Sequence, residues 1–444
     1  MGPRWYGGLN PPLPTELRRC CRVGLALAAV GSWLSTWTEA AGIRDDVTAG
    51  LPATLHPQSG LRGLLRLGGV GSGAQPAVDR STWLFGPTPR RSGGNDRGSD
   101  RRCPWTGLQP PIRSAREARV TSERTALILG ATGGIGGEVA RQLLASGWRV
   151  RALNRKPDDL APASRTSGMV WVQGDAMSAA DVAAAAAGQS VIMHAVNPPG
   201  YRNWAKLVLP MLDNSIAAAR ANDARIVLPG TVYNFGPDAL PNPHEDSPQN
   251  PVTAKGRIRA EMERRLRTAA AAGAKVLIVR AGDYFGPSAA NNWLSQALVK
   301  PGKPVTKITY PGMHGVGHQW AYLPDVAETM VRLLEKSEEL EAYAVFHMTG
   351  HWDADGTEMI EAIRRTAGNV SIKVAAMPWG LMRLLSPVVP LFRELAEMRY
   401  LWRLPVRMDG KRLAAVLGAE PHTPLDVAVR STLIGLGCLA AKKP

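Results

Sequence analysis

Short apolar runs alternate with longer amphipathic stretches from Thr125 onward. The runs have the length of buried strands, and the stretches between them repeat apolar residues at helical spacing. Strands that alternate with helices in this way predict a doubly wound, mostly parallel α/β sheet. The expected strands cover 126–129, 148–153, 170–175, 190–196 and 224–228. The expected helices cover 178–188, 201–222 and 255–272, after a first helix that ends near Gly147.

Three evenly spaced glycines follow the first expected strand. Gly130, Gly133 and Gly136 precede a helix whose apolar face includes Val139 and Leu143. Glycines let the backbone turn tightly and approach a pyrophosphate, whose charge then lies at the positive end of the helix. Strand, glycines and helix together predict a dinucleotide-binding turn. The cofactor contacts expected in this turn are Gly130, Thr132, Gly133, Gly134, Ile135 and Gly136.

The end of the second expected strand indicates which dinucleotide is bound. In such folds an acidic residue at this place holds the ribose hydroxyls, whereas a basic residue accommodates a 2′-phosphate. This chain has Asn154, followed by Arg155 and Lys156. The sequence therefore favours NADP(H) over NAD(H). The alternative is that Arg155 and Lys156 are ordinary solvated turn residues.

The first 124 residues differ in composition from the rest of the chain. They contain 17 Arg, no Lys and nine acidic residues, and so contribute +8 of the formal net charge of +16. They are rich in Gly, Pro, Ser and Trp without sustained periodicity, which predicts a disordered extension over 1–122. The alternative is a secretory signal, because basic residues at 18–22 precede an apolar stretch at 23–34. Since half of the excess charge lies in this part, we expect no nucleic-acid partner.

Cysteine and histidine placement argues against a disulfide framework and against a metal site. Three of the four cysteines lie before residue 124, and only Cys438 lies beyond it. His314 and His318 have no acidic partner at ligand spacing. The apolar segment 375–392 is too interrupted by proline to span a membrane and is expected to cover or pack the smaller part of the protein. We therefore expect a cytoplasmic protein without a metal or a membrane span.

Several motifs occur in the order typical of one family. Residues 125–444 resemble the extended short-chain dehydrogenase/reductases, a group of NAD(P)-dependent epimerases, dehydratases and reductases. The resemblance implies a Rossmann-type sheet over 123–280, a smaller mixed α/β substrate lobe over 281–444, and chemistry in the cleft between them. The matching motifs lie at 130–136, 280–287, 320–327, 409–418 and 423–425.

The resemblance also implies cofactor contacts at the ends of later strands. Asp175 falls where the family has an aspartate that contacts adenine, and Asn214 falls where a central asparagine supports the active site. The further cofactor contacts expected on this basis are Asp175, Ala176, Ala195, Asn197 and Asn214.

The expected catalytic set departs from the family pattern. Thr231 matches the Ser/Thr that binds the reacting oxygen, but no Tyr-x-x-x-Lys occurs in 125–444. Lys255 stands at the tyrosine position and Arg259 at the lysine position. Lys255 could itself be the acid/base, since Arg259 and an oxidised nicotinamide would both lower its pKa. Two alternatives are that Tyr233 supplies the phenol, or that hydride chemistry has been lost and the pocket only senses the cofactor.

The sequence thus predicts an NAD(P)(H)-binding oxidoreductase or epimerase/dehydratase-like enzyme that acts on a small carbonyl, alcohol or sugar-like substrate. The alternative is a redox-inactive NADP(H)-binding sensor. No motif selects a particular substrate. The resemblance implies a homodimer through helices 201–222 and 255–272, and the sequence leaves the oligomeric state open. The expected substrate contacts are Tyr201, Asn203, Tyr284 and Asn292.

Overall fold

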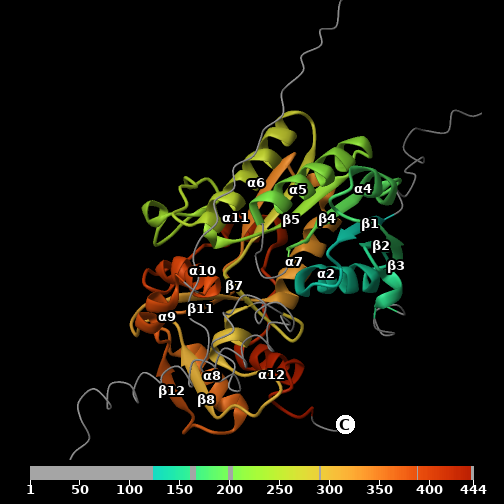
Figure 1. Cartoon of the computed structure of the whole chain (residues 1–444). Coiled ribbons are helices and arrows are strands. Elements are labelled where there is room, and N and C mark those ends of the chain that lie inside the picture. Colours follow the sequence, from blue (N-terminus) through green and yellow to red (C-terminus); the bar gives the residue numbers. More distant parts are fainter. Residues whose placement is uncertain (1–123, 161–166, 199–203, 290–291, 388, 442–444) are drawn as a thin grey trace, which may run out of the picture. The chain divides into compact units, whose positions relative to one another are not determined.

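The computed structural model describes residues 124–160, 167–198, 204–289, 292–387 and 389–441 (Figure 1). The predicted extension over 1–122 lies outside these ranges and stays a prediction. Two of the expected substrate contacts, Tyr201 and Asn203, also lie outside the described residues.

The main sheet has seven strands in the order β10-β6-β5-β4-β1-β2-β3. Every pair of neighbouring strands in it is parallel. The strand order reverses between β1 and β4, which is the topological switch point where open α/β sheets bind ligands. The predicted doubly wound sheet is therefore confirmed. Its strands are β1 (Thr125–Leu129), β2 (Arg149–Asn154), β3 (Val170–Gln173), β4 (Val191–His194), β5 (Arg225–Gly230), β6 (Lys275–Arg280) and β10 (Tyr343–His347).

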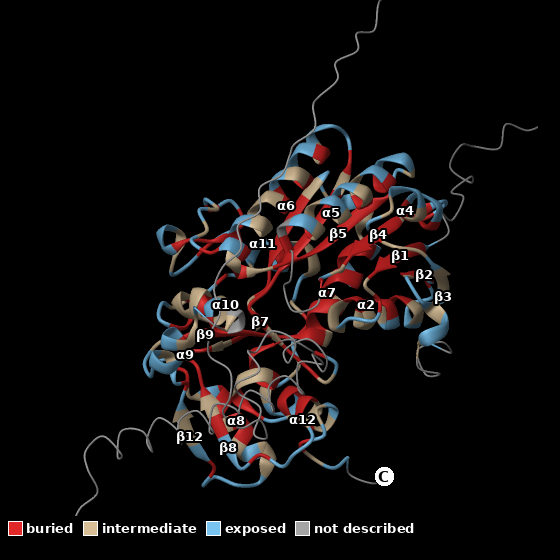
Figure 2. Cartoon of the chain, viewed as in Figure 1, coloured by how far each residue is buried: buried red, intermediate tan, exposed pale blue. Residues whose placement is uncertain are grey.

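The central strands carry the core. All residues of β1, β4 and β5 are buried, whereas β3 at the edge is half-exposed (Figure 2). Strands covered by helices on both faces are buried on both faces, which explains why they stand out in the sequence as continuous apolar runs. This burial is also the reason that the predicted strand positions are confirmed to within a few residues.

Helices cover both faces of the main sheet. One face packs α2, α7 and α11, whose buried side chains form one apolar cluster with the sheet, while α4, α5 and α6 form a second cluster on the opposite face. Local capping fixes two of these helices, since Ser178 accepts a hydrogen bond from the Asp181 N–H and Thr253 from the Gly256 N–H. The helices are α2 (Gly134–Ala145), α4 (Ala179–Ala186), α5 (Trp204–Ala221), α6 (Ala254–Ala271), α7 (Leu323–Glu335) and α11 (Lys411–Leu417).

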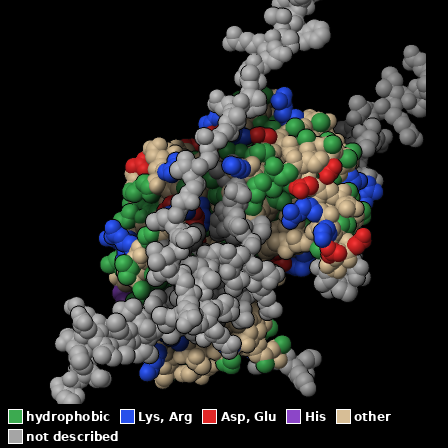
Figure 3. All heavy atoms as spheres, viewed as in Figure 1, with side chains coloured by type: hydrophobic (Ala, Val, Ile, Leu, Met, Phe, Trp, Pro, Cys, Tyr) green, Lys and Arg blue, Asp and Glu red, His purple; other side chains and the backbone are tan. Residues whose placement is uncertain are grey.

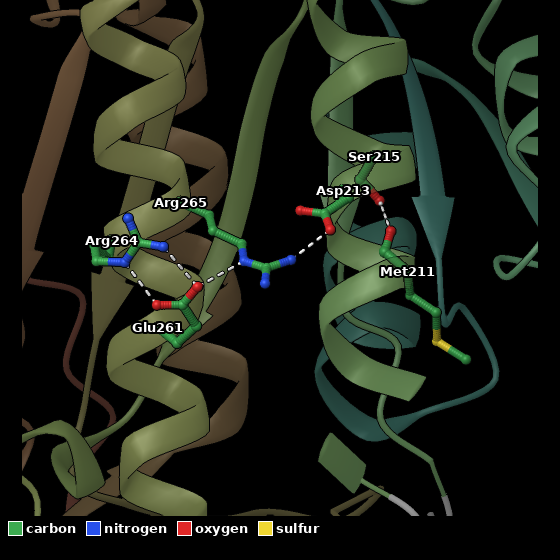
Figure 4. A network of polar contacts seen from close by, with 6 residues as sticks. All are labelled: Met211, Asp213, Ser215, Glu261, Arg264 and Arg265. Atoms are coloured by element: carbon green, nitrogen blue, oxygen red, sulfur yellow. Dashed lines mark hydrogen bonds and ion pairs between the residues drawn. The ribbon is translucent and has the colours of Figure 1, made fainter. Parts of the chain in front are cut away.

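Polar contacts join α5 to α6. Arg265 on α6 pairs with Asp213 on α5, and Glu261 accepts hydrogen bonds from both Arg264 and Arg265 (Figure 4). These two helices match the ranges that the sequence predicted, and the homodimer through them stays a prediction.

The smaller part of the fold is built from two short sheets and several helices. Its apolar core gathers large aromatic side chains, among them Phe285, Trp320 and Trp402. The sheets have the orders β11-β9-β7 and β12-β8. Their strands are β7 (Asp283–Phe285), β8 (Lys307–Tyr310), β9 (His318–Tyr322), β11 (His351–Asp353) and β12 (Lys373–Ala376). The helices are α8 (Glu358–Ala367), α9 (Trp379–Leu385), α10 (Pro390–Met398) and α12 (Leu425–Gly435).

Short helical turns complete the chain: η3 (Pro157–Asp159), η5 (Val232–Asn234), η6 (Pro237–Ala239), η7 (Leu294–Leu298), η8 (Ser337–Glu339) and η9 (Arg399–Trp402).

The main sheet also includes elements that follow the predicted domain boundary at residue 280. Strand β10 pairs with β6, and α7 packs against α2. A cut of the sequence at 280 therefore does not separate the sheet from the rest, and the domain limits stay a prediction.

The visible surface mixes basic, acidic and apolar side chains over the described part (Figure 3). Within the described ranges, no helix combines the length and apolarity needed to cross a membrane. Nor do the described side chains include a group of three or more His, Cys, Asp and Glu that could hold a metal ion.

Candidate functional site

The glycine turn lies at the switch point, between the ends of β1 and β4. Gly130 has a φ of +95°, and a Cβ added there would lie 2.6 Å from the Ala195 carbonyl oxygen. A Cβ on Gly136 would lie 2.3 Å from the Gly130 carbonyl oxygen. Both positions therefore require glycine. Gly133, the N-cap of α2, makes no side-chain capping bond, which leaves the first-turn N–H groups suited to a pyrophosphate.

Asn154 holds the turn after β2, where the adenosine ribose is expected. Its side-chain oxygen accepts a hydrogen bond from the Lys156 N–H at 2.8 Å. The Arg155 side chain is exposed, and Lys156 forms an exposed ion pair with Asp159 at 3.3 Å. Two basic side chains are therefore close to this strand end in a solvated turn. Both the phosphate-binding role and the plain surface role that the sequence left open stay compatible with this geometry.

Asn214 anchors the loop that follows β3. Its Nδ2 donates a hydrogen bond to the Ala176 carbonyl oxygen at 2.9 Å. In the same loop the Asp175 carboxylate accepts the Met177 N–H at 2.9 Å, and the Asp175 N–H donates to Asp181 at 2.9 Å. The contact of Asn214 thus links α5 to the loop after β3, where the resemblance places the adenine.

Four side chains lie around the ends of β4 and β5, on the expected nicotinamide side. The Trp204 indole N–H donates to the Asn197 side-chain oxygen at 2.8 Å, and the Arg259 guanidinium lies 5.3 Å from the centre of the Trp204 ring. The Tyr284 hydroxyl donates to the Gly230 carbonyl oxygen at 3.2 Å. Burial raises the pKa of Tyr284, against the positive charge of Arg259.

His194, at the end of β4, is a buried neutral side chain. Its Nδ1 lies 2.8 Å from the Ser215 hydroxyl oxygen. Because Ser215 donates its own proton to the Met211 carbonyl oxygen, His194 Nδ1 carries the proton of this bond. Burial, and secondly the charge of Arg259, lower the pKa of His194 to about 3.

Lys255 is buried at the start of α6 and paired with an acid from a distant segment. Its Nζ lies 3.1 Å from a carboxylate oxygen of Glu394 on α10. Burial lowers the pKa of Lys255, while the charge of Glu394 raises it. We expected Arg259 and an oxidised nicotinamide to lower this pKa. The structure corrects the first cause, since desolvation of the enclosed side chain lowers it, and the effect of the nicotinamide stays a prediction. Sequence spacing gave no signal for Glu394, which lies 139 residues further along the chain.

The first turn of α6 lies against η5, so that Lys255 and Thr231 come from adjoining segments. A Cβ on Gly256 would lie 2.3 Å from the Tyr233 carbonyl oxygen. The Thr231 hydroxyl donates to the Asn234 side-chain oxygen at 3.3 Å. Tyr233 is half-buried and packs against the apolar core of the smaller part. The phenol role of Tyr233 stays a prediction.

Asn292 uses its side chain within its own turn. Its amide nitrogen donates to the Ala289 carbonyl oxygen, and its amide oxygen accepts the Ser295 N–H at 2.9 Å. These bonds give Asn292 a structural task at the start of η7, and its substrate contact stays a prediction.

A groove of about 550 Å³ adjoins the start of α6. It lies between Val252 and Thr253 on one side and the α9–α10 region on the other, where Glu397 accepts the Ala254 N–H at 3.1 Å. Its lining includes three arginines and two aromatic residues, together with the acidic Glu397 and apolar side chains: Arg383, Arg399, Arg403, Trp379, Tyr400, Val252, Ala396 and Leu404. The sequence predicted the apolar segment 375–392 as a cover but did not indicate this groove.

The fold and the glycine turn define a Rossmann-type protein with a dinucleotide-binding turn. Residues 130–292 match the family model described as NAD(P)H-binding. The chain therefore carries an NAD(P)H-binding domain, and the predicted class of cofactor is confirmed.

Two curated proteins are similar to parts of the chain. The uncharacterized protein y4nL of Sinorhizobium fredii (strain NBRC 101917 / NGR234) is 31% identical over 198 residues, which are 40% of this chain and 55% of that protein. The NmrA-like family domain-containing oxidoreductase notA of Aspergillus sp. (strain MF297-2) is 46% identical over 69 residues, 15% of this chain and 20% of that protein. The matches thus span about half of the first relative and a fifth of the second.

One solved structure is similar in fold over nearly its entire length. The UDP-glucuronic acid 4-epimerase from Bacillus cereus, in complex with UDP-glucuronic acid and NAD, has a TM-score of 0.55 at 16% identity. The match covers 70% of this chain and 98% of the epimerase. The resemblance to NAD-dependent epimerases and dehydratases is therefore confirmed in domain and fold.

Proposed function

We propose that this protein is an NADP(H)-dependent oxidoreductase or epimerase-like enzyme that uses Lys255 as its acid/base. The observation that carries the proposal is the buried ion pair between Lys255 and Glu394, at the start of the helix where related enzymes have their catalytic tyrosine. A buried lysine beside carboxylates can change protonation during a reaction, because burial favours its neutral form while Glu394, and secondly Glu397, favour its charged form.

In the reductive direction, the Lys255 ammonium donates a proton to the carbonyl oxygen of the substrate, and Glu394 keeps the side chain in place. In the oxidative direction, neutral Lys255 accepts the proton of the alcohol. A bound NADPH or NADP⁺ supplies or receives the hydride. Arg259, whose Nε is buried and makes no hydrogen bond among the described residues, supplies positive charge beside the nicotinamide end.

The preference for NADP(H) is part of this proposal. Arg155 and Lys156 offer two positive charges to a 2′-phosphate, and Asn154 has no carboxylate to repel it. The exposed position of both basic side chains supports the proposal, because a phosphate can reach them without rearranging the core.

The groove beside α6 supports a substrate that carries negative charge. Arg383, Arg399 and Arg403 line it together with Trp379, over whose ring Arg399 lies at 5.3 Å. The epimerase of similar fold binds a UDP-sugar, in which a diphosphate accompanies a sugar. We infer a sugar-like carbonyl or alcohol with an anionic group as the substrate class.

The experiment is a panel of carbonyl and alcohol substrates assayed with NADPH and NADP⁺, in the wild-type protein and in the Lys255→Met variant. We expect Lys255→Met to abolish turnover and to spare NADPH binding. Lys300→Met, a change at an exposed lysine outside the site, is the matched control and should leave both unchanged.

A second candidate function is a redox-inactive NADP(H) sensor, favoured by the absence of Tyr-x-x-x-Lys from 125–444. It predicts that NADPH stays unoxidised across the whole panel and that Lys255→Met weakens NADPH binding. If instead Tyr233→Phe inactivates the protein and Lys255→Met does not, the acid/base role belongs to Tyr233.

A further inference from the structure

A chain of side-chain hydrogen bonds leads from Thr231 into the core. The Thr231 hydroxyl donates to the Asn234 amide oxygen at 3.3 Å. The Asn234 amide nitrogen donates to the Gln249 amide oxygen at 3.0 Å, and the Gln249 amide nitrogen donates to Glu263 Oε2 at 2.6 Å. Each bond therefore runs in the same direction, from Thr231 toward Glu263.

A buried ion pair fixes the far end of this chain. Glu263 is 3% exposed and Arg280 is 0% exposed, and Arg280 Nη2 lies 2.5 Å from Glu263 Oε2. Arg280 also hydrogen-bonds His347 and lies 4.9 Å from the centre of the Phe235 ring. Glu263 Oε2 thus accepts hydrogen bonds from both Arg280 and Gln249.

The carboxylate sets the orientation of each amide in turn. A carboxylate only accepts hydrogen bonds, so Gln249 must turn its amide nitrogen toward Glu263 and its oxygen toward Asn234. Asn234 must then turn its nitrogen toward Gln249 and its oxygen toward Thr231. Because an amide oxygen only accepts, the Thr231 hydroxyl has to donate its proton inward. If the Gln249 amide were turned around, its oxygen would face the oxygen of Glu263. Asn234 and Glu263 are both nearly inaccessible to water, so water could not replace the lost hydrogen bonds.

We propose that Asn234, Gln249 and Glu263 are positioning residues that make Thr231 a hydrogen-bond acceptor toward the substrate. Thr231 then selects substrates that present an O–H or N–H group to its lone pairs, such as a hydroxyl beside the reacting carbon. A bare carbonyl oxygen offers it no proton. The orientation of Thr231 stands by itself, and the substrate selectivity rests on the proposed enzymatic function.

The hydroxyl group of Tyr284 also donates its proton to an acceptor inside the protein. The Tyr284 phenol donates its proton to the Gly230 carbonyl oxygen at 3.2 Å. The Thr231 and Tyr284 hydroxyl groups thus both direct their protons into the protein, and neither supplies the proton for a carbonyl oxygen. This agrees with the role proposed for Lys255.

Neutron diffraction from deuterated crystals of the full chain tests the orientation without any substrate. We expect deuterium on Thr231 Oγ1 directed at the Asn234 oxygen, and the Asn234 ND₂ group directed at Gln249. An Asn234 ND₂ group that faces Thr231 would overturn the proposal.

A double-mutant cycle tests whether the hydrogen-bond chain affects catalysis. Gln249→Leu and Thr231→Val should each lower kcat/KM for a hydroxyl-bearing substrate about 10-fold, the loss of one hydrogen bond, and the double variant should lose no more. Each should also reduce the preference for that substrate over its deoxy counterpart, while Thr231→Ser retains it. Losses that multiply, with the preference unchanged, would refute a positioning role.

Two controls separate this inference from the proposed function. Gln296→Leu removes a glutamine that is half-buried like Gln249 but is not part of the hydrogen-bond chain from Thr231 to Glu263. This variant should leave kcat/KM and the substrate preference unchanged. If no substrate is turned over, the proposed function fails, and the same cycle measured by urea unfolding still decides whether Gln249 and Thr231 are coupled. Independent stability losses there would overturn the inference.

Discussion

Replacing Glu394 with glutamine removes the carboxylate that pairs with the buried Lys255. The two side chains are 10% and 28% exposed, and 3.1 Å separates Lys255 Nζ from Glu394 Oε2. Unit charges at that distance attract by about 5 kcal/mol at an effective dielectric constant of about 20. The full attraction is not lost, because Glu394 is partly solvated, the charge of Glu397 still acts on Lys255, and Lys255 can lose its proton. We therefore expect Glu394→Gln to lower the free energy of unfolding by about 2–3 kcal/mol at neutral pH.

The pH dependence of this loss has a definite sign. Burial lowers the pKa of Lys255 in the folded chain below its ordinary value of 10.5. Between the folded and unfolded pKa values the unfolded chain binds more protons, so the contribution of Lys255 makes stability rise with pH as the pH approaches 10.5 from below. Without the raising effect of Glu394 the folded pKa falls further, and the rise begins at lower pH in Glu394→Gln.

Urea unfolding between about pH 6 and pH 10 measures both effects. Lys255→Met should remove this part of the pH dependence. Glu328→Gln is the control, because it breaks an ion pair with Arg332 whose side chains are 42% and 47% exposed, and it should cost less than about 1 kcal/mol. A loss in Glu394→Gln no larger than in Glu328→Gln, or a pH profile like that of the natural chain, would refute the reasoning.

Three further predictions concern the cofactor and the chain ahead of the domain. Arg155→Ala should weaken NADPH binding by about 1–3 kcal/mol, the range for a charged hydrogen bond, and leave NADH binding unchanged in a fluorescence titration; equal losses would contradict the 2′-phosphate assignment. Gly136→Ala should abolish cofactor binding, because its Cβ would lie 2.3 Å from the Gly130 carbonyl oxygen, whereas Gly380→Ala, with nothing within 4 Å, should bind normally. A chain that begins at Ser122 should keep full NADPH affinity and Tm, and a drop of several degrees in Tm would show that the preceding residues pack on the domain.

The conformation of the glycine turn could be predicted because its determinants are local. Gly130 follows β1 directly and Gly136 lies in the first turn of α2, so the spacing already contains the tight turn that their close contacts confirm. The buried strands were equally readable, since a strand covered on both faces must be apolar along its whole length. The class of cofactor follows from these local features.

The environment of Lys255 could not be predicted in the same way. The sequence offered Arg259, four residues along the helix, as the cause of a lowered pKa. In the folded chain, enclosure of the side chain lowers the pKa, and Glu394 on α10 opposes this. Both effects depend on segments that are distant in sequence and carry no spacing signal.

By itself, the sequence determined the parallel sheet and the dinucleotide turn, because hydrophobic periodicity and glycine spacing act over a few neighbouring residues. Tertiary structure decided that β10 completes the sheet, that Glu394 pairs with Lys255, and that Glu263 orients Thr231 through two amides. The physical reason is that charge pairing and hydrogen-bond direction depend on distances in space, and these are set only when the apolar faces have packed.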